Sequence, residues 1–260
     1  MSTVLVTGGT GDLGSKLVER FVAAGDAVRV LSRRPRPADA TTEWAQGDME
    51  TGVGIGEAVK GTDLVVHAAT GGGTRAKADV PGTRNLLAAC KAARTPHFFY
   101  ISIVGLEKIP LGYYKAKLEC ERLIEESGMP WSNLRATQFH ALMDGFLQMF
   151  SRVPLVLPAP KSFKFQPIDT GEVADRMVQD AAKGPSGRLA DIGGPEVMMF
   201  GEIAKQWQRA TGKSKPIVNV PLLGGVARGY KAGFNCTPEH ADGKVTWVEW
   251  LERRYRAAVA

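Results

Sequence analysis

The sequence has few cysteines, no metal-ligand spacing and no long apolar run. Its three cysteines, Cys90, Cys120 and Cys236, stand far apart and form no C-x-x-C pair, which argues against a zinc knuckle or a disulfide framework. We therefore expect reduced thiols and no metal site. No apolar stretch approaches the roughly eighteen residues of a membrane helix, and no charged, apolar leader precedes the first apolar run. These absences predict a cytoplasmic protein with no membrane partner.

Hydrolytic and nucleic-acid signatures are also missing. The chain has no H-E-x-x-H motif, no paired carboxylates and no Ser-His-Asp order of the kind that a hydrolase uses. Its 33 basic and 27 acidic residues give a net charge of +6, but the basic residues form no stripe interleaved with aromatic ones. We expect a small-molecule substrate and no nucleic-acid partner, and the sequence leaves the oligomeric state open.

The start of the chain predicts a dinucleotide-binding turn. An apolar, β-branched run over Thr3–Thr7 enters the segment T-G-G-T-G-D-L-G, Thr7–Gly14, after which apolar residues recur at helical spacing. Gly8 permits a tight turn, Gly11 lets the backbone approach a pyrophosphate, and Gly14 allows close helix packing. The helix N-terminus would then face the phosphates. The residues predicted to bind the cofactor here are Thr7, Gly8, Thr10, Gly11, Asp12, Leu13 and Gly14, and an ordinary glycine-rich turn is the alternative.

The end of the second predicted strand, Ala27–Ser32, favours NADP(H) over NAD(H). About twenty residues past the glycines, an NAD-selecting fold places an acid that binds the ribose 2′-hydroxyl. Arg33 and Arg34 follow this strand instead, and a guanidinium can hold a 2′-phosphate through a bidentate, charge-assisted contact. The alternative is a solvated basic loop that also includes Arg36.

Strand and helix signals alternate through the first two-thirds of the chain. This alternation predicts an α/β fold with a Rossmann-like, doubly wound parallel sheet. Further strands are expected over Asp63–Ala69, His97–Ile103, Trp131–Ala136, Phe163–Ile168 and Leu189–Ile192, and helices over Asp79–Ala93, Gly112–Ser127, Phe200–Thr211 and Thr246–Arg256. From about Phe139, prolines break the pattern. We expect one domain over residues 1–260, with a small interleaved C-terminal substrate lobe built mainly from 139–166 and 196–260.

Four short motifs occur in a fixed order along this pattern. They are the glycines of 8–14, Gly47-Asp48 after the third strand, V-V-H-A-A at 65–69 and G-T-R-N-L-L at 82–87. In this combination the chain resembles the short-chain dehydrogenase/reductase superfamily, and within it the atypical, NmrA-like NAD(P)H-binding branch. The resemblance covers roughly residues 1–195.

The resemblance implies positions for cofactor and substrate. Asp48 and Met49 would border the adenine, and Ala68, Ala69 and Thr70 would line the cofactor path. Gln138 would bind the cofactor, and Phe139 and His140 would lie beside the nicotinamide and the substrate. His140 could instead be a packed or capping residue, whereas His67, inside an apolar strand, is expected to be a satisfied core residue. The glycine-rich segment Gly71–Lys77 is expected to form a rim of the site.

The resemblance also implies that Tyr113 and Lys117 form the Y-x-x-x-K pair, with Lys117 reaching the nicotinamide ribose as well. Residues four apart on a helix share a face, so the charge of Lys117, together with the positive nicotinamide, is expected to bring the pKa of the Tyr113 phenol closer to the working range. A purely structural or cofactor-positioning role is the alternative. Ser102 would be the third catalytic residue, but Ile103 takes the place of the family's second hydroxyl residue, so Ser102 could lie buried one pleat away.

These features together predict an NADPH-dependent oxidoreductase that transfers hydride to a carbonyl, quinone or similar conjugated acceptor. The rival is a non-catalytic NADP(H)-binding sensor or regulator of the NmrA-like type. The identity of the substrate and the direction of the reaction are not predicted.

Overall fold

A computed structural model describes residues 1–38, 40–71 and 77–256. Residues 72–76, most of the segment expected to form a rim, lie outside the described residues. The chain divides into two compact units, and each is considered by itself. The first unit comprises Met1–Ser102, Leu111–Arg135 and Val173–Ala190, and the second comprises Ile103–Pro110, Ala136–Glu172 and the chain from Asp191 onward.

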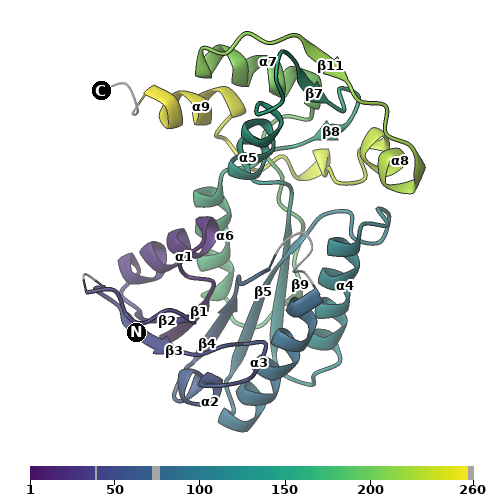
Figure 1. Ribbon diagram of the computed structural model, residues 1–260. Helices are drawn as coiled ribbons and strands as arrows, with labels where there is room; N and C mark the ends of the chain where they lie inside the picture. Colours follow the sequence, from purple (N-terminus) through teal and green to yellow (C-terminus); the bar gives the residue numbers. More distant parts are fainter. Residues whose placement is uncertain (39, 72–76, 257–260) are drawn as a thin grey trace. The chain divides into compact units, whose positions relative to one another are not determined.

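A parallel sheet forms the centre of the first unit (Figure 1). Within the described residues its seven strands lie in the order β3-β2-β1-β4-β5-β6-β9. The strands are β1 (Thr3–Thr7), β2 (Ala27–Ser32), β3 (Glu43–Gln46), β4 (Leu64–His67), β5 (His97–Ile103), β6 (Trp131–Ala136) and β9 (Gly187–Arg188). From β1 the chain proceeds to β2 and β3 on one side, and then to β4, β5 and β6 on the other. This order confirms the predicted doubly wound, Rossmann-like α/β sheet.

Helices cover both faces of this sheet (Figure 1). They are α1 (Asp12–Ala23), α2 (Ile55–Val59), α3 (Asp79–Ala93), α4 (Gly112–Glu125) and α6 (Thr170–Ala181), the last of which belongs to this unit from Val173. Ile55 of α2, Leu86 of α3 and Ile124 of α4 share one apolar core with Leu5 and Phe98 of the sheet. Burying each such side chain contributes about 1.5–3 kcal/mol, so the continuous apolar strands fix the position of the helices.

The register of the strands defines the edge at which the functional segments gather. Thr7 of β1 pairs with His67 of β4, and His67 pairs with Tyr100 of β5. One row of residues therefore runs from the carboxyl ends of β1 and β4 to the middle of β5, which extends three residues further. Ligands of doubly wound sheets bind outside this edge, and the segments that follow β1, β2 and β4 all leave the sheet there.

The second unit has short strands of two or three residues and is rich in aromatic side chains. Its elements are α5 (His140–Phe150), β7 (Leu157–Ala159), β8 (Lys164–Phe165), β10 (Met198–Met199), α7 (Phe200–Thr211), β11 (Ile217–Asn219), α8 (Gly224–Ala232), a short 3-10 helix (Pro238–His240) and α9 (Trp247–Arg256). β8 pairs with β10 antiparallel, and β7 pairs with β11 parallel. Phe165, Phe200, Trp207 and Trp247 are buried together in its core.

Two strand predictions need correction. The last strand of the main sheet is β9, at Gly187–Arg188, whereas Leu189–Ile192 was predicted; Ile192 makes only an isolated bridge, to Ala136. In the predicted segment only Ile192 is buried, and the ladder with β6 uses the two residues before that segment. The strand predicted over Phe163–Ile168 is limited to β8, which pairs with β10 rather than with the main sheet.

α2 and α8 were not predicted from the sequence. α2 contains Gly56, and α8 contains three glycines, and glycine costs a helix interior about 1 kcal/mol relative to alanine. In α8 the glycine at 229 is needed for packing, because a Cβ there would lie 2.7 Å from Cγ1 of Ile109. Tertiary contact therefore overrides a poor local propensity.

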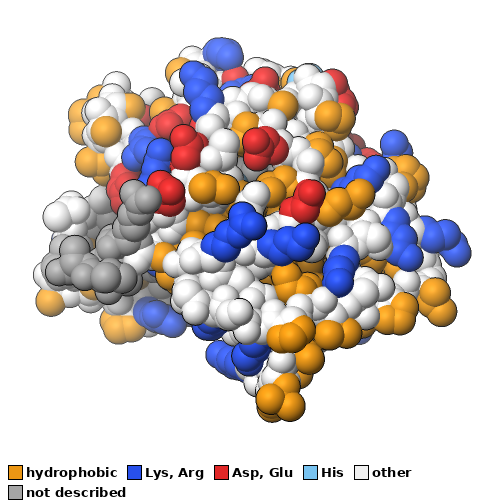
Figure 2. All heavy atoms as spheres, turned by 90° about the horizontal axis from the view of Figure 1, so that it is seen from above, with side chains coloured by type: hydrophobic (Ala, Val, Ile, Leu, Met, Phe, Trp, Pro, Cys, Tyr) orange, Lys and Arg blue, Asp and Glu red, His pale blue; other side chains and the backbone are white. Residues whose placement is uncertain are grey.

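The distribution of basic side chains on the surface and the character of the helices are relevant to nucleic-acid and membrane partners. On the face in Figure 2, Lys and Arg side chains lie dispersed among apolar, acidic and neutral ones rather than in one continuous stripe. Over the part of the chain that the structure describes, none of the helices combines the length and the apolar character that crossing a bilayer requires.

Candidate cofactor and catalytic site

In the glycine loop after β1, the positions of Gly8 and Gly14 are packed too closely for a side chain. Gly8 has φ +71°, and a Cβ on it would lie 2.8 Å from Cα of Ala69. A Cβ on Gly14 would lie 2.0 Å from the carbonyl oxygen of Gly8. The loop is closed by the Gly11 amide, which donates to the same oxygen at 2.8 Å. The glycines at 8 and 14 thus press the loop against α1 and against the segment after β4.

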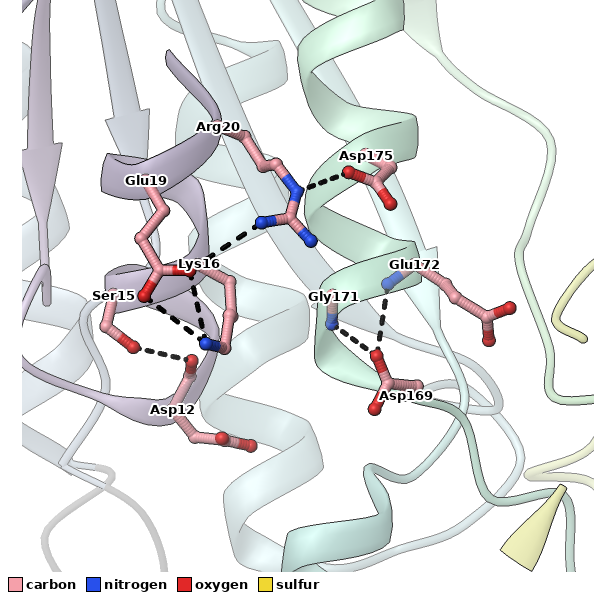
Figure 3. Close-up of polar contacts among 9 residues, drawn as sticks. All are labelled: Asp12, Ser15, Lys16, Glu19, Arg20, Asp169, Gly171, Glu172 and Asp175. Atoms are coloured by element: carbon pink, nitrogen blue, oxygen red, sulfur yellow. Dashed lines mark hydrogen bonds and ion pairs between the residues drawn. The ribbon is translucent and has the colours of Figure 1, made fainter. Parts of the chain in front are cut away.

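The N-terminus of α1 differs from that of α6. The N-cap residue of α1 is Gly11, and no side chain caps the helix; the hydroxyl of Ser15 donates instead to the carbonyl of Asp12 at 3.1 Å (Figure 3). At α6, by contrast, Asp169 accepts the amide of Gly171 at 2.8 Å (Figure 3). The uncapped first turn of α1 presents N–H groups and the positive end of the helix dipole to an anion. The loop and this helix end together fit a diphosphate.

α1 is held in place away from its N-terminus. Nε of Arg20 donates to Oδ1 of Asp175 on α6 at 2.6 Å, and Lys16 pairs with Glu19 at 3.2 Å (Figure 3). Both contacts lie beyond the first turn of α1, and the pair with Asp175 links this helix to α6.

Arg33 and Arg34 lie at the end of β2 with exposed side chains. Their carbonyls are held from β3: Nε2 of Gln46 donates to Arg33 at 3.3 Å, and Nε1 of Trp44 donates to Arg34 at 2.9 Å. Among the described residues, neither guanidinium forms an ion pair. The backbone is therefore fixed, while two cationic groups remain available to a phosphate.

The segments after β3 and β4 are ordered by hydrogen bonds. Asp48 accepts the amide of Glu50 at 2.8 Å, and Nδ2 of Asn85 donates to the carbonyl of Met49 at 2.9 Å. The amide of Ala69 donates to Oγ1 of Thr7 at 3.2 Å, which ties the segment after β4 to the start of the glycine loop. The positions predicted to border the cofactor are thus held at one edge of the sheet.

A buried chain of hydrogen-bonded polar groups leads to Thr7, at the carboxyl end of β1. The hydroxyl of Thr83 donates its hydrogen to Sγ of Cys120 at 3.3 Å. It can therefore only accept from His67, whose Nε2–H donates to it at 3.0 Å. Nδ1 of His67 then carries no hydrogen and accepts the hydroxyl of Thr7 at 2.8 Å. Burial, together with the charge of Lys117, lowers the pKa of His67 to about 3. His67 is therefore a neutral, fully bonded core residue, as predicted.

Tyr113, at the start of α4, meets Thr70 from the segment after β4. Their hydroxyl oxygens are 3.4 Å apart, and Oγ1 of Thr70 donates to Oδ2 of Asp79 at 2.6 Å. Burial raises the pKa of Tyr113, and the negative charge of Asp79 adds to that increase. At neutral pH the phenol is protonated and can act as an acid.

Lys117 of α4 contacts two residues of β5. Its amine donates to the carbonyl of Ile101 at 2.9 Å and lies 4.3 Å from the centre of the Tyr100 ring. Burial lowers the pKa of Lys117, against the charges of Cys120, Asp79 and Glu121. In the protein without cofactor, burial raises the pKa of Tyr113 rather than lowering it, and the joint effect expected from Lys117 and a bound nicotinamide stays a prediction. The shared helical face brings the two residues near each other, but the amine is directed toward β5.

Ser102 lies buried on β5, with 3% of its surface exposed. It is a polar neighbour of Glu121 on α4, which pairs with Arg135 and, at 3.5 Å, with Arg188. Burial opposes ionisation of Glu121, but the Arg135 guanidinium, which donates to its carboxylate, and the nearby polar side chains of Ser102 and Asn133 outweigh burial and hold its pKa below the ordinary value. This environment corresponds to the buried alternative for Ser102, and its catalytic role stays a prediction.

The residues predicted beside the nicotinamide belong to the second unit. Nδ2 of Asn235 donates to Oε1 of Gln138 at 3.0 Å. His140 donates through Nε2 to the carbonyl of Val245 at 3.1 Å and stacks on Trp247, and burial lowers its pKa to about 4. Phe139, half-buried, is the N-cap residue of α5. These contacts fit the packing alternative for His140, and the roles of all three toward ligands stay predictions.

Comparison with known proteins identifies the family. A family model described as NAD(P)H-binding matches residues 8–179, which includes the glycine loop, Arg33, Thr70 and Tyr113. The first structural expectation, a dinucleotide-binding turn in a Rossmann-like sheet, agrees with this match.

Curated relatives are distant. The chain is 26% identical over 238 residues to the chloroplastic protein High Chlorophyll Fluorescence Phenotype 244 of Arabidopsis thaliana, covering 85% of this chain but only 58% of that relative. It is 25% identical over 237 residues to the photosystem II assembly factor Ycf39 of Cyanophora paradoxa (85% and 72% covered). It is 24% identical over 233 residues to quinone oxidoreductase 2 of Escherichia coli (84% and 77% covered).

Solved structures share the fold. The NADPH-dependent quinone oxidoreductase QOR2 of Escherichia coli, solved with NADPH, superposes with a TM-score of 0.79 at 19% identity, covering 97% of this chain and 99% of that one. This similarity agrees with the resemblance to the short-chain dehydrogenase/reductase superfamily. With a matching family model over most of its length and the glycine loop that such a family requires, the chain belongs to the NAD(P)H-binding family.

Proposed function

We propose that this protein is an NADPH-dependent reductase that transfers hydride to a carbonyl, quinone or similar conjugated small molecule. The observation that carries the proposal is the protonated phenol of Tyr113, held beside Thr70 at the carboxyl edge of the same sheet that carries the glycine loop. An acid at this edge is what carbonyl reduction needs, because the acceptor oxygen must gain a proton as its carbon gains hydride.

In this proposal, different residues of the chain bind the cofactor and donate the proton. The backbone of Gly8–Gly14 and the first turn of α1 bind the diphosphate, and Arg33 and Arg34 hold the 2′-phosphate of NADPH. When bound, NADPH supplies the hydride. Tyr113 donates its phenolic proton to the acceptor oxygen. Lys117 orients the ribose if its amine exchanges the Ile101 carbonyl for a ribose hydroxyl.

The test of this function is turnover with a panel of carbonyl and quinone acceptors, followed by NADPH absorbance. Replacing Tyr113 with Phe removes the acid, so kcat should fall about 100- to 10,000-fold while the Kd for NADPH stays within twofold. Tyr114→Phe removes a hydroxyl from the adjacent position of α4 and serves as the control. Full activity of the Tyr113→Phe protein would remove Tyr113 from the mechanism.

The rival function is an NADP(H)-binding regulator that performs no turnover. It is favoured by the relative whose name describes an assembly factor and by the Lys117 amine, which is bound to the backbone of β5. Tight NADPH binding, with no acceptor in the panel consuming NADPH, would replace the reductase proposal with this one.

The proposal places the protein in a reducing compartment such as the cytoplasm. The three cysteines are free thiols, and burial raises the pKa of Cys90 to about 12, so they are poorly reactive.

A further inference from the structure

Asp79 is a buried carboxylate whose partners are two consecutive residues. It lies in the first turn of α3 and is 8% exposed. Oδ2 accepts the hydroxyl of Thr70 at 2.6 Å, and Oδ1 accepts the amide of Gly71 at 2.7 Å. Among the described residues, no lysine or arginine forms a salt bridge with it. Its hydrogen bonds therefore serve to hold the segment that follows β4.

The short contact decides which way the Thr70 hydroxyl points. A hydroxyl has one hydrogen, and the charge-assisted bond to Asp79, at 2.6 Å, is much shorter than the 3.4 Å contact to Tyr113. The hydrogen of Thr70 is thus directed to Asp79, and a lone pair is left facing the phenol. In that arrangement Tyr113 is the donor and Thr70 is the acceptor.

We propose that Asp79, acting through Thr70, is a positioning residue that keeps Tyr113 as a protonated phenol and so adapts the site to proton donation. The inference rests on the proposed reductase function and adds a residue to it. If Tyr113 were a phenolate, its oxygen would face a lone pair of Thr70 and, beyond Thr70, the negative charge of Asp79. Both the lone pair and the charge disfavour the phenolate. After the phenol O–H bond breaks and the acceptor O–H bond forms, the phenolate regains a proton from solvent.

Other groups near Tyr113 act in the same direction or on other partners. Cys120 of α4 also raises the pKa of Tyr113, and Tyr100 of β5 is coupled to it. Lys117 of α4 donates to the carbonyl of Ile101. The ring of Tyr114 lies 6.3 Å from that of Tyr113. Asp79 is the group among these that is both charged and linked to Tyr113 through a hydroxyl.

The direct test is the titration of Tyr113 in the full-length protein without any acceptor. NMR of ring-labelled tyrosine, with the resonance assigned by Tyr113→Phe, gives the phenol pKa. In Asp79→Asn the shape of the side chain is kept and the charge is lost, so this pKa should fall by about one unit or more. Asp63→Asn is the control, because Asp63 also accepts a backbone amide, that of Thr3 at 2.8 Å, at the opposite end of β1.

Thr70 variants test the direction of the hydrogen bond. Thr70→Val removes the acceptor and should lower the pKa of Tyr113, whereas Thr70→Ser should restore it. A higher pKa in Thr70→Val would mean that Thr70 donates to the phenolate, and this would overturn the inference. The same pair carries the test if Asp79→Asn does not fold, as judged by circular dichroism.

The outcomes separate the two proposals. An unchanged pKa of Tyr113 in Asp79→Asn overturns the role of Asp79, whatever the activity of the protein. A lowered pKa in a protein that reduces no acceptor supports the role of Asp79 and contradicts the proposed function. With both correct, the protonated phenol is the active form, so kcat falls above its pKa, and in Asp79→Asn this alkaline decrease begins at lower pH.

Discussion

At the scale of single residues, Tyr113 shows what a motif can and cannot predict. The spacing of Tyr113 and Lys117 predicted a shared helical face, but an electrostatic effect depends on where the charged atom lies. The Lys117 amine lies over the Tyr100 ring. Asp79 escaped prediction because an acid in the first turn of a helix is usually explained by the helix dipole. Its contact with Thr70 depends on the fold, which brings the end of β4 to the start of α3.

A second prediction at the scale of residues concerns Arg33 and the choice between NADPH and NADH. Its exposed guanidinium has no ion pair among the described residues, so we expect it to bind the 2′-phosphate of NADPH. A charge-assisted hydrogen bond contributes about 1.5–3 kcal/mol, and Arg33→Glu should weaken NADPH binding about 10- to 100-fold while changing NADH binding little. Calorimetric titration with both nucleotides measures this difference. Arg36→Glu, the same charge change three residues on, should have a much smaller effect because the Arg36 side chain donates to the carbonyl of Ala40. Equal losses for NADPH and NADH would contradict the assignment.

At the scale of elements, the sequence predicted best where local pattern and tertiary packing agree. β1, β2, β5 and β6 have the predicted bounds, and β1 and β5 show the largely apolar runs that a parallel strand needs where helices cover both faces. Prediction was wrong for the last strand, where the ladder uses Gly187–Arg188, and α8 was missed because it contains glycines, of which Gly229 is required by close packing on Ile109. The uncapped start of α1 could be anticipated from Gly11, a residue with no capping side chain.

The glycine loop supplies the prediction at this scale. A Cβ at Gly14 would lie 2.0 Å from the Gly8 oxygen, so Gly14→Ala must push the loop away from α1. We expect a loss of about 1–3 kcal/mol in the free energy of unfolding and weaker NADPH binding, measured by urea denaturation and by titration. Gly56→Ala is the matched control, since a Cβ there meets nothing within 4 Å; it should leave binding unchanged and stability equal or slightly higher. Normal NADPH affinity in Gly14→Ala would exclude the close loop packing as a requirement for the site.

At the scale of the whole molecule, the residues proposed for the cofactor's phosphates and for acid catalysis all belong to the first unit. The glycine loop, Arg33, Thr70, Asp79 and Tyr113 follow or precede strands of one parallel sheet. The second unit has its own aromatic core and contains the residues predicted from the family resemblance to meet the substrate. A sequence pattern can predict which segment binds the cofactor and which segment meets the substrate. It does not identify the acceptor, because the acceptor is selected by side chains brought together from distant parts of the chain.

The most direct test of the central claim is hydrogen exchange of the full-length protein with and without NADPH, followed by mass spectrometry. If the βα junction binds the diphosphate and the arginines bind the 2′-phosphate, amide protection should increase over residues 7–14 and 32–34, and NADH should protect the second segment less. Saturation with NADPH that leaves both segments unprotected would contradict the account.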